Sequence, residues 1–146
     1  MNLEETYAIV TGGASGLGEA TVRAIIAGGG KVAILDMDSS RGNELVKELG
    51  SSTIFCKTDV TNEDNVKSAI EKTIETFGKL NVVLNFAGIA VAVKTIGRDG
   101  PHDLDLYKKV VDVNLNGTFN VCRLAAEYIS KNASNESGLT GLIVNT

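Results

Sequence analysis

The chain has 146 residues, enough for one domain with a hydrophobic core; 43% of them are hydrophobic and 22% are charged, which is typical of a globular protein. The net charge of -4 argues against nucleic acid or an anionic membrane surface as a partner, because both attract basic faces. No segment is apolar for long enough to cross a membrane, and the acidic residues 1–11 are typical of neither a signal nor a transit peptide, so we expect a cytoplasmic protein.

Short β-rich runs alternate with longer helical patterns along the first part of the chain. In chain order we predict a strand over residues 7–11, a helix over 17–28, a strand over 32–36, a helix over 40–49, a strand over 53–56, a helix over 63–77 and a strand over 82–86. Gly50 and Gly78 are C-terminal stops of the second and third helices, and the pair Thr61 and Asn62 is the N-cap of the third.

The remainder is predicted to form a long loop over residues 89–103, a long helix over 104–131, a polar loop over 132–138 and a strand. The strand is the closing segment GLIVNT, residues 141–146, which is expected to be buried. Because the strands are continuous apolar runs, helices should cover both faces of the sheet. The pattern predicts an α/β fold of the Rossmann type, a doubly wound parallel sheet truncated after the fifth strand.

The segment TGGASGLG, residues 11–18, lies between the first strand and the first helix. A strand that turns straight into a helix aims backbone N–H groups and the positive end of the helix dipole at one point. Glycines there let a pyrophosphate approach the backbone and let the helix pack on the sheet. The segment therefore indicates a dinucleotide site, with a simple tight turn as the alternative.

Asp36 ends the second strand, where a carboxylate can accept hydrogen bonds from both hydroxyls of an adenosine ribose. The same charge would repel a 2′-phosphate. Met37 and Ser15 beside it are uncharged, so no neighbouring cation compensates. Asp36 therefore favours NAD over NADP, and the alternative is an ordinary turn residue at a strand end.

The spacing Thr-Gly-x-x-x-Gly-x-Gly resembles that of the short-chain dehydrogenase/reductase family, and three later segments resemble the family in the same order. They are Asp59-Val60 after the third strand, NFAG at residues 85–88 and VNLNGTF at residues 113–119. A closer resemblance is to the subgroup of type 2 3-hydroxyacyl-CoA dehydrogenases, also described as 17β-hydroxysteroid dehydrogenases. It is carried by TGGASGLG, AGIAVAVKT, the extended loop to Leu106 and DVNLNGTFNVCRLAA.

The resemblance implies an enzyme that transfers a hydride between NAD and a secondary alcohol, with a 3-hydroxyacyl-CoA or a hydroxysteroid as the small-molecule substrate. It implies a homo-oligomer for the full-length protein, and the mitochondrial matrix of the resembling animal enzymes as a second location. Eleven residues would contact the cofactor. The pyrophosphate loop comprises Gly12, Ser15, Gly16, Leu17 and Gly18; Asp36 holds the adenine ribose, Asp59 and Val60 the adenine, and Phe86, Ala87 and Gly88 the nicotinamide-side ribose.

Two of these positions carry specific expectations. Phe86 replaces the Asn that the family usually has, so only its backbone role is implied. Asn114 takes the place of a catalytic Asn that holds a water in the family's proton relay. Asn is a poor helix former, and a broken local rule is typical of functional sites. The alternative is a polar residue that simply bonds to backbone.

The resemblance also implies a catalytic Ser after the fifth strand and a Tyr-Lys pair, which the 146 residues do not supply. None of Tyr7, Tyr107 and Tyr128 is followed four residues later by lysine, and His102 is expected to be an exposed loop residue. We therefore predict that residues 1–146 are the N-terminal NAD-binding Rossmann domain of a longer dehydrogenase, inactive by itself. The alternatives are a non-catalytic nucleotide-binding fragment or interaction module, and a nucleotide-fold enzyme of another class such as a methyltransferase.

The two cysteines, Cys56 and Cys122, lie far apart and lack the spacing of metal ligands. We expect free thiols in a reducing compartment, and no metal site.

Overall fold

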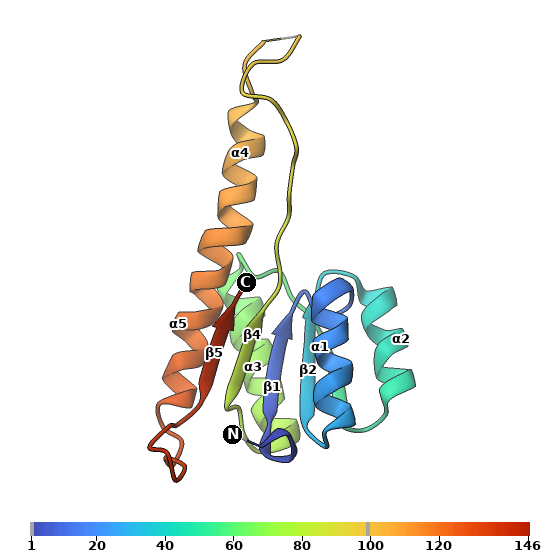
Figure 1. Ribbon diagram of the computed structural model, residues 1–146, viewed down its shortest axis with the longest axis vertical. Helices are drawn as coiled ribbons and strands as arrows, with labels where there is room; N and C mark the ends of the chain where they lie inside the picture. The colour runs from blue at the N-terminus through green and yellow to red at the C-terminus, as the bar shows by residue number, and fades with distance from the viewer. Residues whose placement is uncertain (1, 99) are drawn as a thin grey trace.

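The computed structural model describes residues 2–98 and 100–146, and in it five parallel strands form a sheet of order β3-β2-β1-β4-β5 (Figure 1). The chain starts in the middle of the sheet, steps outward to one edge and then crosses to the other side, which is the doubly wound Rossmann arrangement that the sequence predicts. The strands are β1 (Tyr7–Thr11), β2 (Lys31–Asp36), β3 (Thr53–Lys57), β4 (Val82–Asn85) and β5 (Leu142–Asn145).

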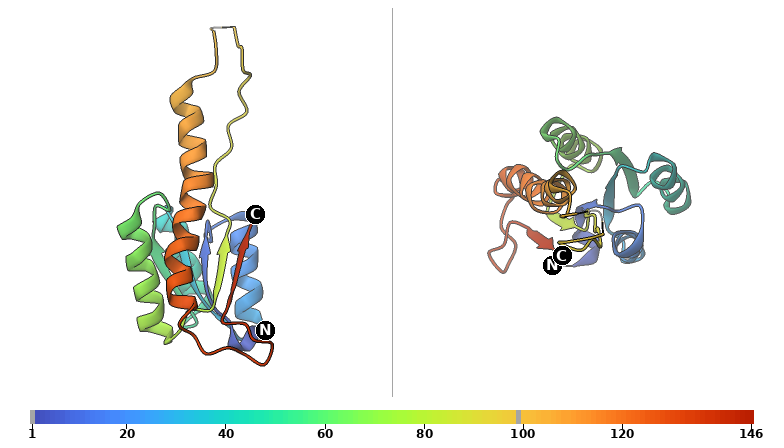
Figure 2. Two further views of the ribbon diagram at one scale, coloured as in Figure 1. Left: turned by 90° about the vertical axis from the view of Figure 1, so that its left-hand side faces the viewer. Right: turned by 90° about the horizontal axis from the view of Figure 1, so that it is seen from above.

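Helices cover both faces of the sheet, as Figure 2 shows from above. The helices are α1 (Gly16–Ala27), α2 (Ser39–Leu49), α3 (Glu63–Phe77), α4 (Leu104–Val111) and α5 (Thr118–Ile129), with short η1 (Leu3–Glu5) before β1. Val10 and Ile34 pack with α1 and α2 on one face, while Ile9 and Leu35 pack with α3 and α5 on the other. Successive residues of β1 and β2 thus enter opposite cores, and both strands are buried as predicted.

Capping groups account for the helix boundaries. The side chain of Asp38 accepts from the backbone N–H of Arg41 at the start of α2, and Asn62 accepts from Asn65 at the start of α3. Gly78 ends α3 with a left-handed φ of 79°, which glycine adopts without steric cost. The predicted bounds of α3 are confirmed at both ends.

The long helix predicted over residues 104–131 is a continuous helical rod, but its central segment is π-helical rather than α-helical. Between α4 and α5 the six residues of η2 (Asp112–Gly117) form a π-helical segment, and α5 ends at Ile129. This segment holds Asn114, Asn116 and Gly117, which are weak formers of α-helix. A one-turn π-bulge widens the helix locally and is frequent at functional sites.

Residues 89–98, residues 100–103 and α4 form an arm that extends away from the sheet (Figures 1 and 2), and residue 99 of the predicted loop lies outside the described residues. The arm returns on itself through an antiparallel bridge between Ile96 and Pro101. Several of its apolar side chains, including Ile96, Leu104 and Tyr107, are exposed. Among the residues described, no helix has both the length and the apolar character that a membrane span requires.

The prediction that GLIVNT is a buried strand is wrong for most of its side chains. β5 pairs with β4 in parallel register at the sheet edge, and Ile143 packs on the core beneath α5. Leu142 and Val144 point to the other face and are 47% and 39% exposed, because no described helix covers them. An apolar run therefore identified the strand correctly but not its burial.

Candidate functional site

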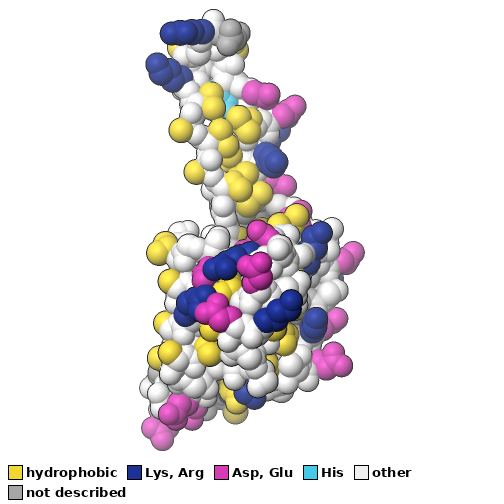
Figure 3. All heavy atoms as spheres, turned by 90° about the vertical axis from the view of Figure 1, so that its right-hand side faces the viewer, with side chains coloured by type: hydrophobic (Ala, Val, Ile, Leu, Met, Phe, Trp, Pro, Cys, Tyr) yellow, Lys and Arg dark blue, Asp and Glu magenta, His cyan; other side chains and the backbone are white. Residues whose placement is uncertain are grey.

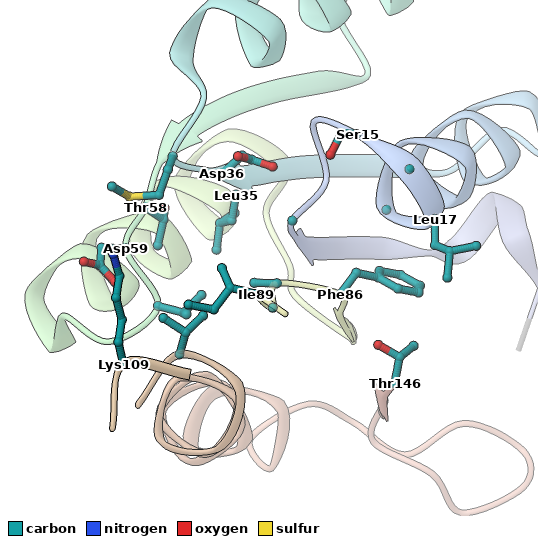
Figure 4. Close-up of a pocket in the computed structure, with 18 residues that line it drawn as sticks. Ser15, Leu17, Leu35, Asp36, Thr58, Asp59, Phe86, Ile89, Lys109 and Thr146 are labelled. Carbon is teal, nitrogen blue, oxygen red and sulfur yellow. The ribbon is translucent and has the colours of Figure 1, made fainter. Parts of the chain in front are cut away.

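A cavity of about 680 Å³ opens at the carboxyl ends of the strands (Figure 4). Its walls come from the segments that follow β1 to β4, from α4 and η2, and from the end of β5. The structure brings all eleven predicted cofactor contacts into this wall: Gly12, Ser15, Gly16, Leu17, Gly18, Asp36, Asp59, Val60, Phe86, Ala87 and Gly88. Crevices at this edge of a parallel sheet are the usual ligand sites of doubly wound folds.

Three glycines shape the segment between β1 and α1. A Cβ at Gly12, where φ is 63°, would lie 2.8 Å from the backbone nitrogen of Ala87, and one at Gly18 would lie 2.1 Å from the carbonyl oxygen of Gly12. These two glycines therefore allow the turn to pack against α1 and the segment after β4. Gly16 has a φ of 53° and lines the cavity, and a Cβ there would meet no atom of another segment within 4 Å, so space is open beside it.

The amino end of α1 points its free donors at the cavity. Ser15 is the N-cap in extended conformation, and its side chain makes no capping hydrogen bond. The first backbone N–H that bonds within the turn is that of Glu19, to the carbonyl of Ser15. The N–H groups of residues 15–18 and the positive end of the helix dipole are thus available to an anion.

The carboxylate of Asp36 connects two of the cavity loops. Oδ2 accepts from the backbone N–H of Ala14 at 3.0 Å, and Oδ1 accepts from that of Asp38 at 3.0 Å. Each oxygen keeps acceptor capacity for a further donor. The ion pairs formed within residues 2–98 and 100–146 do not include Asp36, so its charge is not neutralised.

The segment after β3 is held in place by Asn120, which sequence reasoning missed. Asn120 is buried on α5, and its Nδ2 donates to the carbonyl oxygen of Val60 at 2.8 Å. Asp59 turns back on its own segment, where Oδ1 accepts from the N–H and the hydroxyl of Thr61. The sequence feature that could have identified Asn120 is its place on the apolar face of a helix, because a buried side-chain amide needs hydrogen-bond partners.

The segment after β4 is fixed by Thr11 and Asn85. The backbone N–H of Ala87 donates to the Thr11 hydroxyl at 3.1 Å, and that of Phe86 to the Thr11 carbonyl at 3.1 Å. The Thr11 hydroxyl in turn donates to Oδ1 of Asn85 at 3.3 Å. Residues 86–88 therefore line the cavity in a set conformation.

Asn114 does not line the cavity itself. Its Oδ1 accepts from the N–H of Ile89 and its Nδ2 donates to the carbonyl of Ile89, both at 2.9 Å. Ile89 is part of the cavity wall. These contacts are those of the backbone-bonding alternative, although the amide retains one N–H and one lone pair with which a water could bond.

Seven further residues line the cavity that the sequence did not identify. Figure 4 places Leu17, Phe86 and Thr146 toward one end and Thr58, Asp59 and Lys109 toward the other. Most of the missed residues flank predicted strand ends, which is the signal that could have found them; Lys109 and Val113 come from the helical rod and carry no local motif. They are Leu35, Met37, Thr58, Ile89, Lys109, Val113 and Thr146.

Comparison with known proteins places the chain among dehydrogenases in sequence and fold. The family model described as short chain dehydrogenase matches residues 6–146. A 3-hydroxyacyl-CoA dehydrogenase type-2 of Drosophila melanogaster is 42% identical over 146 residues, which cover 99% of this chain and 57% of the relative. An ipsdienol dehydrogenase of Ips pini is 36% identical over 148 residues, covering 99% and 57%.

A solved structure is equally similar. The crystal structure of 3-hydroxyacyl-CoA dehydrogenase type-2 from Mycobacterium avium superimposes with a TM-score of 0.90 at 42% identity, covering 98% of this chain and 56% of that one. The chain therefore spans somewhat more than half the length of the relatives it matches.

Proposed function

We propose, on the premise that this chain belongs to the short-chain dehydrogenase family, that residues 1–146 form the NAD-binding Rossmann domain of an oxidoreductase. The observation that carries the proposal is the cavity, in which all eleven predicted cofactor contacts meet from four separate loops. The cavity lies at the carboxyl ends of the parallel strands, where doubly wound folds usually bind their ligands. Bound NAD would supply a group that accepts or donates a hydride.

The residues present suit a dinucleotide. The uncapped amino end of α1 offers backbone donors for a pyrophosphate, and the open space at Gly16 lets the phosphates approach. Asp36 offers acceptor oxygens for the ribose hydroxyls at the end of β2. Asp59 and Val60 would contact the adenine, and residues 86–88 the second ribose through backbone groups.

The charge at Asp36 supports NAD rather than NADP. A 2′-phosphate would be repelled by the Asp36 carboxylate, which forms no ion pair among the residues that the structure describes. Like charges in close contact cost several kcal/mol, about 100-fold or more in affinity. The hydroxyls of an unphosphorylated ribose would instead donate to the same oxygens.

We propose a secondary alcohol as substrate, and a 3-hydroxyacyl-CoA in particular. The similarity to 3-hydroxyacyl-CoA dehydrogenases type-2 supports this choice, and a hydroxysteroid or another alcohol is the alternative, as the similarity to an ipsdienol dehydrogenase illustrates. Within the whole protein Asn114 would hold a water of the proton relay. Because none of the three tyrosines precedes a lysine by four residues, we expect residues 1–146 alone to bind NAD without turnover.

We also propose that the whole protein is a homo-oligomer in a reducing compartment, the cytoplasm or the mitochondrial matrix. Leu115 and Phe119, one turn apart on the helical rod, are 65% and 66% exposed, and apolar side chains so exposed are typical of an interface. Cys56 and Cys122 are both free thiols, which suits a reducing compartment.

The test is to titrate the purified chain with NADH and with NADPH and to monitor binding by the fluorescence of the nucleotide. We expect saturable binding of NADH and binding of NADPH weaker by about 100-fold, given the charge at Asp36. Binding of neither nucleotide would overturn the proposal for this domain. For the substrate, NADH formation by the whole natural protein would be compared between 3-hydroxybutyryl-CoA and a non-acyl secondary alcohol such as ipsdienol.

A further inference from the structure

We propose that Glu19 is a second specificity-determining residue: it binds the guanidinium of Arg41 and so withholds a cation from the place where a 2′-phosphate would lie. The inference rests on the proposed function and deepens it. In this view, discrimination against a phosphorylated ribose has two parts. Asp36 repels the phosphate directly, and Glu19 occupies the nearby arginine that would otherwise attract it.

The pair joins the first turns of two neighbouring helices. Nη2 of Arg41, on α2, donates to both carboxylate oxygens of Glu19, on α1, at 2.8 and 2.9 Å. Only 17% of the Glu19 side chain is exposed, compared with 42% of Arg41. Figure 3 shows basic and acidic side chains interspersed on the face that these helices form. Glu19 is therefore the member of the pair that is less exposed to solvent.

Both members stand beside the ribose end of the cavity. Asp36 accepts from the backbone N–H of Asp38, and Asp38 accepts from the backbone N–H of Arg41, so Arg41 is one capping turn away from the ribose-binding carboxylate. On the other helix Glu19 directly follows Gly18, which lines the cavity. The two helix ends that flank the cavity are thus bridged by this ion pair.

The carboxylate of Glu19 is also a strong partner for the guanidinium of Arg41. The hydrogen bonds from Arg41, and then those from Arg23, hold the pKa of Glu19 below its ordinary value, so the carboxylate is ionised at neutral pH. A planar guanidinium pairs well with carboxylate or phosphate, and the two compete for the same donors. Without Glu19, the one carboxylate left to Arg41 among the described residues would be the exposed Glu44, at 3.4 Å.

One other cation near Asp36 has to be distinguished from Arg41. Lys57 is the register partner of Asp36 across β2 and β3, and its side chain is exposed. It forms no ion pair within the described part of the chain. A gain in phosphate affinity that depended on Lys57 would not involve Glu19, so the experiment includes a variant that removes Arg41.

The experiment measures the dissociation constants of NADH and NADPH for D36N, D36N/E19Q, D36N/E48Q and D36N/E19Q/R41A. Glu48 is the matched control, because it belongs to the same charged cluster but binds Arg23 and not Arg41. We expect E19Q in the D36N background to tighten NADPH binding about 10-fold, the effect of one hydrogen bond between charged groups. NADH binding should change less than about 2-fold, since its ribose carries no phosphate.

The gain should disappear in the triple variant and be absent with E48Q. Equal NADPH affinities for D36N/E19Q and D36N/E48Q would overturn the inference, and so would a gain that survives R41A. If D36N does not fold, the same comparison of E19Q with E48Q in the presence of Asp36 decides the question with a smaller expected gain. A wild-type chain that binds neither nucleotide overturns the proposed function itself, whereas NADH binding without the E19Q effect overturns only this inference.

Discussion

The side-chain amide of Asn114 and the backbone of Ile89 exchange two hydrogen bonds, each 2.9 Å long. Ile89 lies where the chain leaves the sheet after β4, and Asn114 lies in the π-helical segment of the rod. The exchange satisfies both backbone groups of Ile89 without a strand partner. It attaches the rod to the cavity wall at the point where the rod is widened.

Replacing Asn114 by Ala should therefore destabilise the fold. Two hydrogen bonds are lost and the backbone groups of Ile89 lose their partner, which costs about 1–3 kcal/mol in the free energy of unfolding. The measurement is urea denaturation. Asn116 is the matched control: it lies on the same segment, but among the described residues its side chain bonds to Asp112 alone, so N116A should cost less than about 0.5 kcal/mol. Equal losses in both variants would show that the amide pair does not stabilise the site.

Gly18 should tolerate no side chain. A Cβ there would lie 2.1 Å from the Gly12 carbonyl oxygen, so Ala forces the turn and α1 apart. We expect G18A to weaken NADH binding at least about 10-fold, since a misplaced loop loses its backbone contacts. G50A is the control: with a φ of 81° and a ψ of -160° Gly50 has a backbone conformation that essentially only glycine adopts, so Ala should cost about 1–3 kcal/mol, but Gly50 does not line the cavity. NADH affinity should stay unchanged in G50A, and an unchanged affinity in G18A would contradict the packing argument.

The two thiols should differ in reactivity. Burial raises the pKa of the Cys56 thiol, which disfavours the reactive thiolate. Cys122 is only partly buried. A chromogenic disulfide reagent should therefore modify one thiol quickly in the native chain and the second only after denaturant is added. In C122S the fast phase should vanish; its persistence would mean that Cys56 is accessible.

The contribution of Glu19 to stability should depend on pH in a defined direction. Hydrogen bonds from Arg41 and Arg23 lower its pKa in the folded chain below the ordinary 4.5. The stabilisation is thus fully present above the unfolded value and is lost as the pH falls through the lower folded value. Denaturation of wild type and E19Q from pH 7 to pH 3 should show a constant difference near neutrality that shrinks below about pH 4.5. E75Q, an exposed glutamate without an ion pair in the described part of the chain, should show no such change.

Local chemistry explains which features the sequence could predict. The Gly-rich turn and Asp36 follow from a short motif, and the doubly wound fold follows from the alternation of apolar runs with helical patterns. The cavity residues 59–60 and 86–88 could be anticipated only from the resemblance to a family. The π-helical segment was not predicted: its weak helix formers are visible in the sequence, but its contacts are with distant residues, since Asn114 bonds to Ile89, 25 residues away, and Gly117 lies against Val60. The exposure of β5 depends on which helices cover it, and a strand's own sequence does not contain that information.

Asn120 provides a sharp test of how residues 59–60, which we propose to contact the adenine, are positioned. Its Nδ2 donates to the Val60 carbonyl at 2.8 Å, and its Oδ1 accepts from Arg123 at 2.7 Å. N120A leaves a buried carbonyl unpaired, which should cost about 1–3 kcal/mol and let residues 59–60 shift. A purely structural role would lower the unfolding free energy alone. A positioning role would also weaken binding of 5′-AMP and NADH by the same factor, because both carry the adenine. R123Q, which keeps the bond to Val60, should leave both affinities unchanged, and a loss there equal to that in N120A would assign the effect to the surface charge.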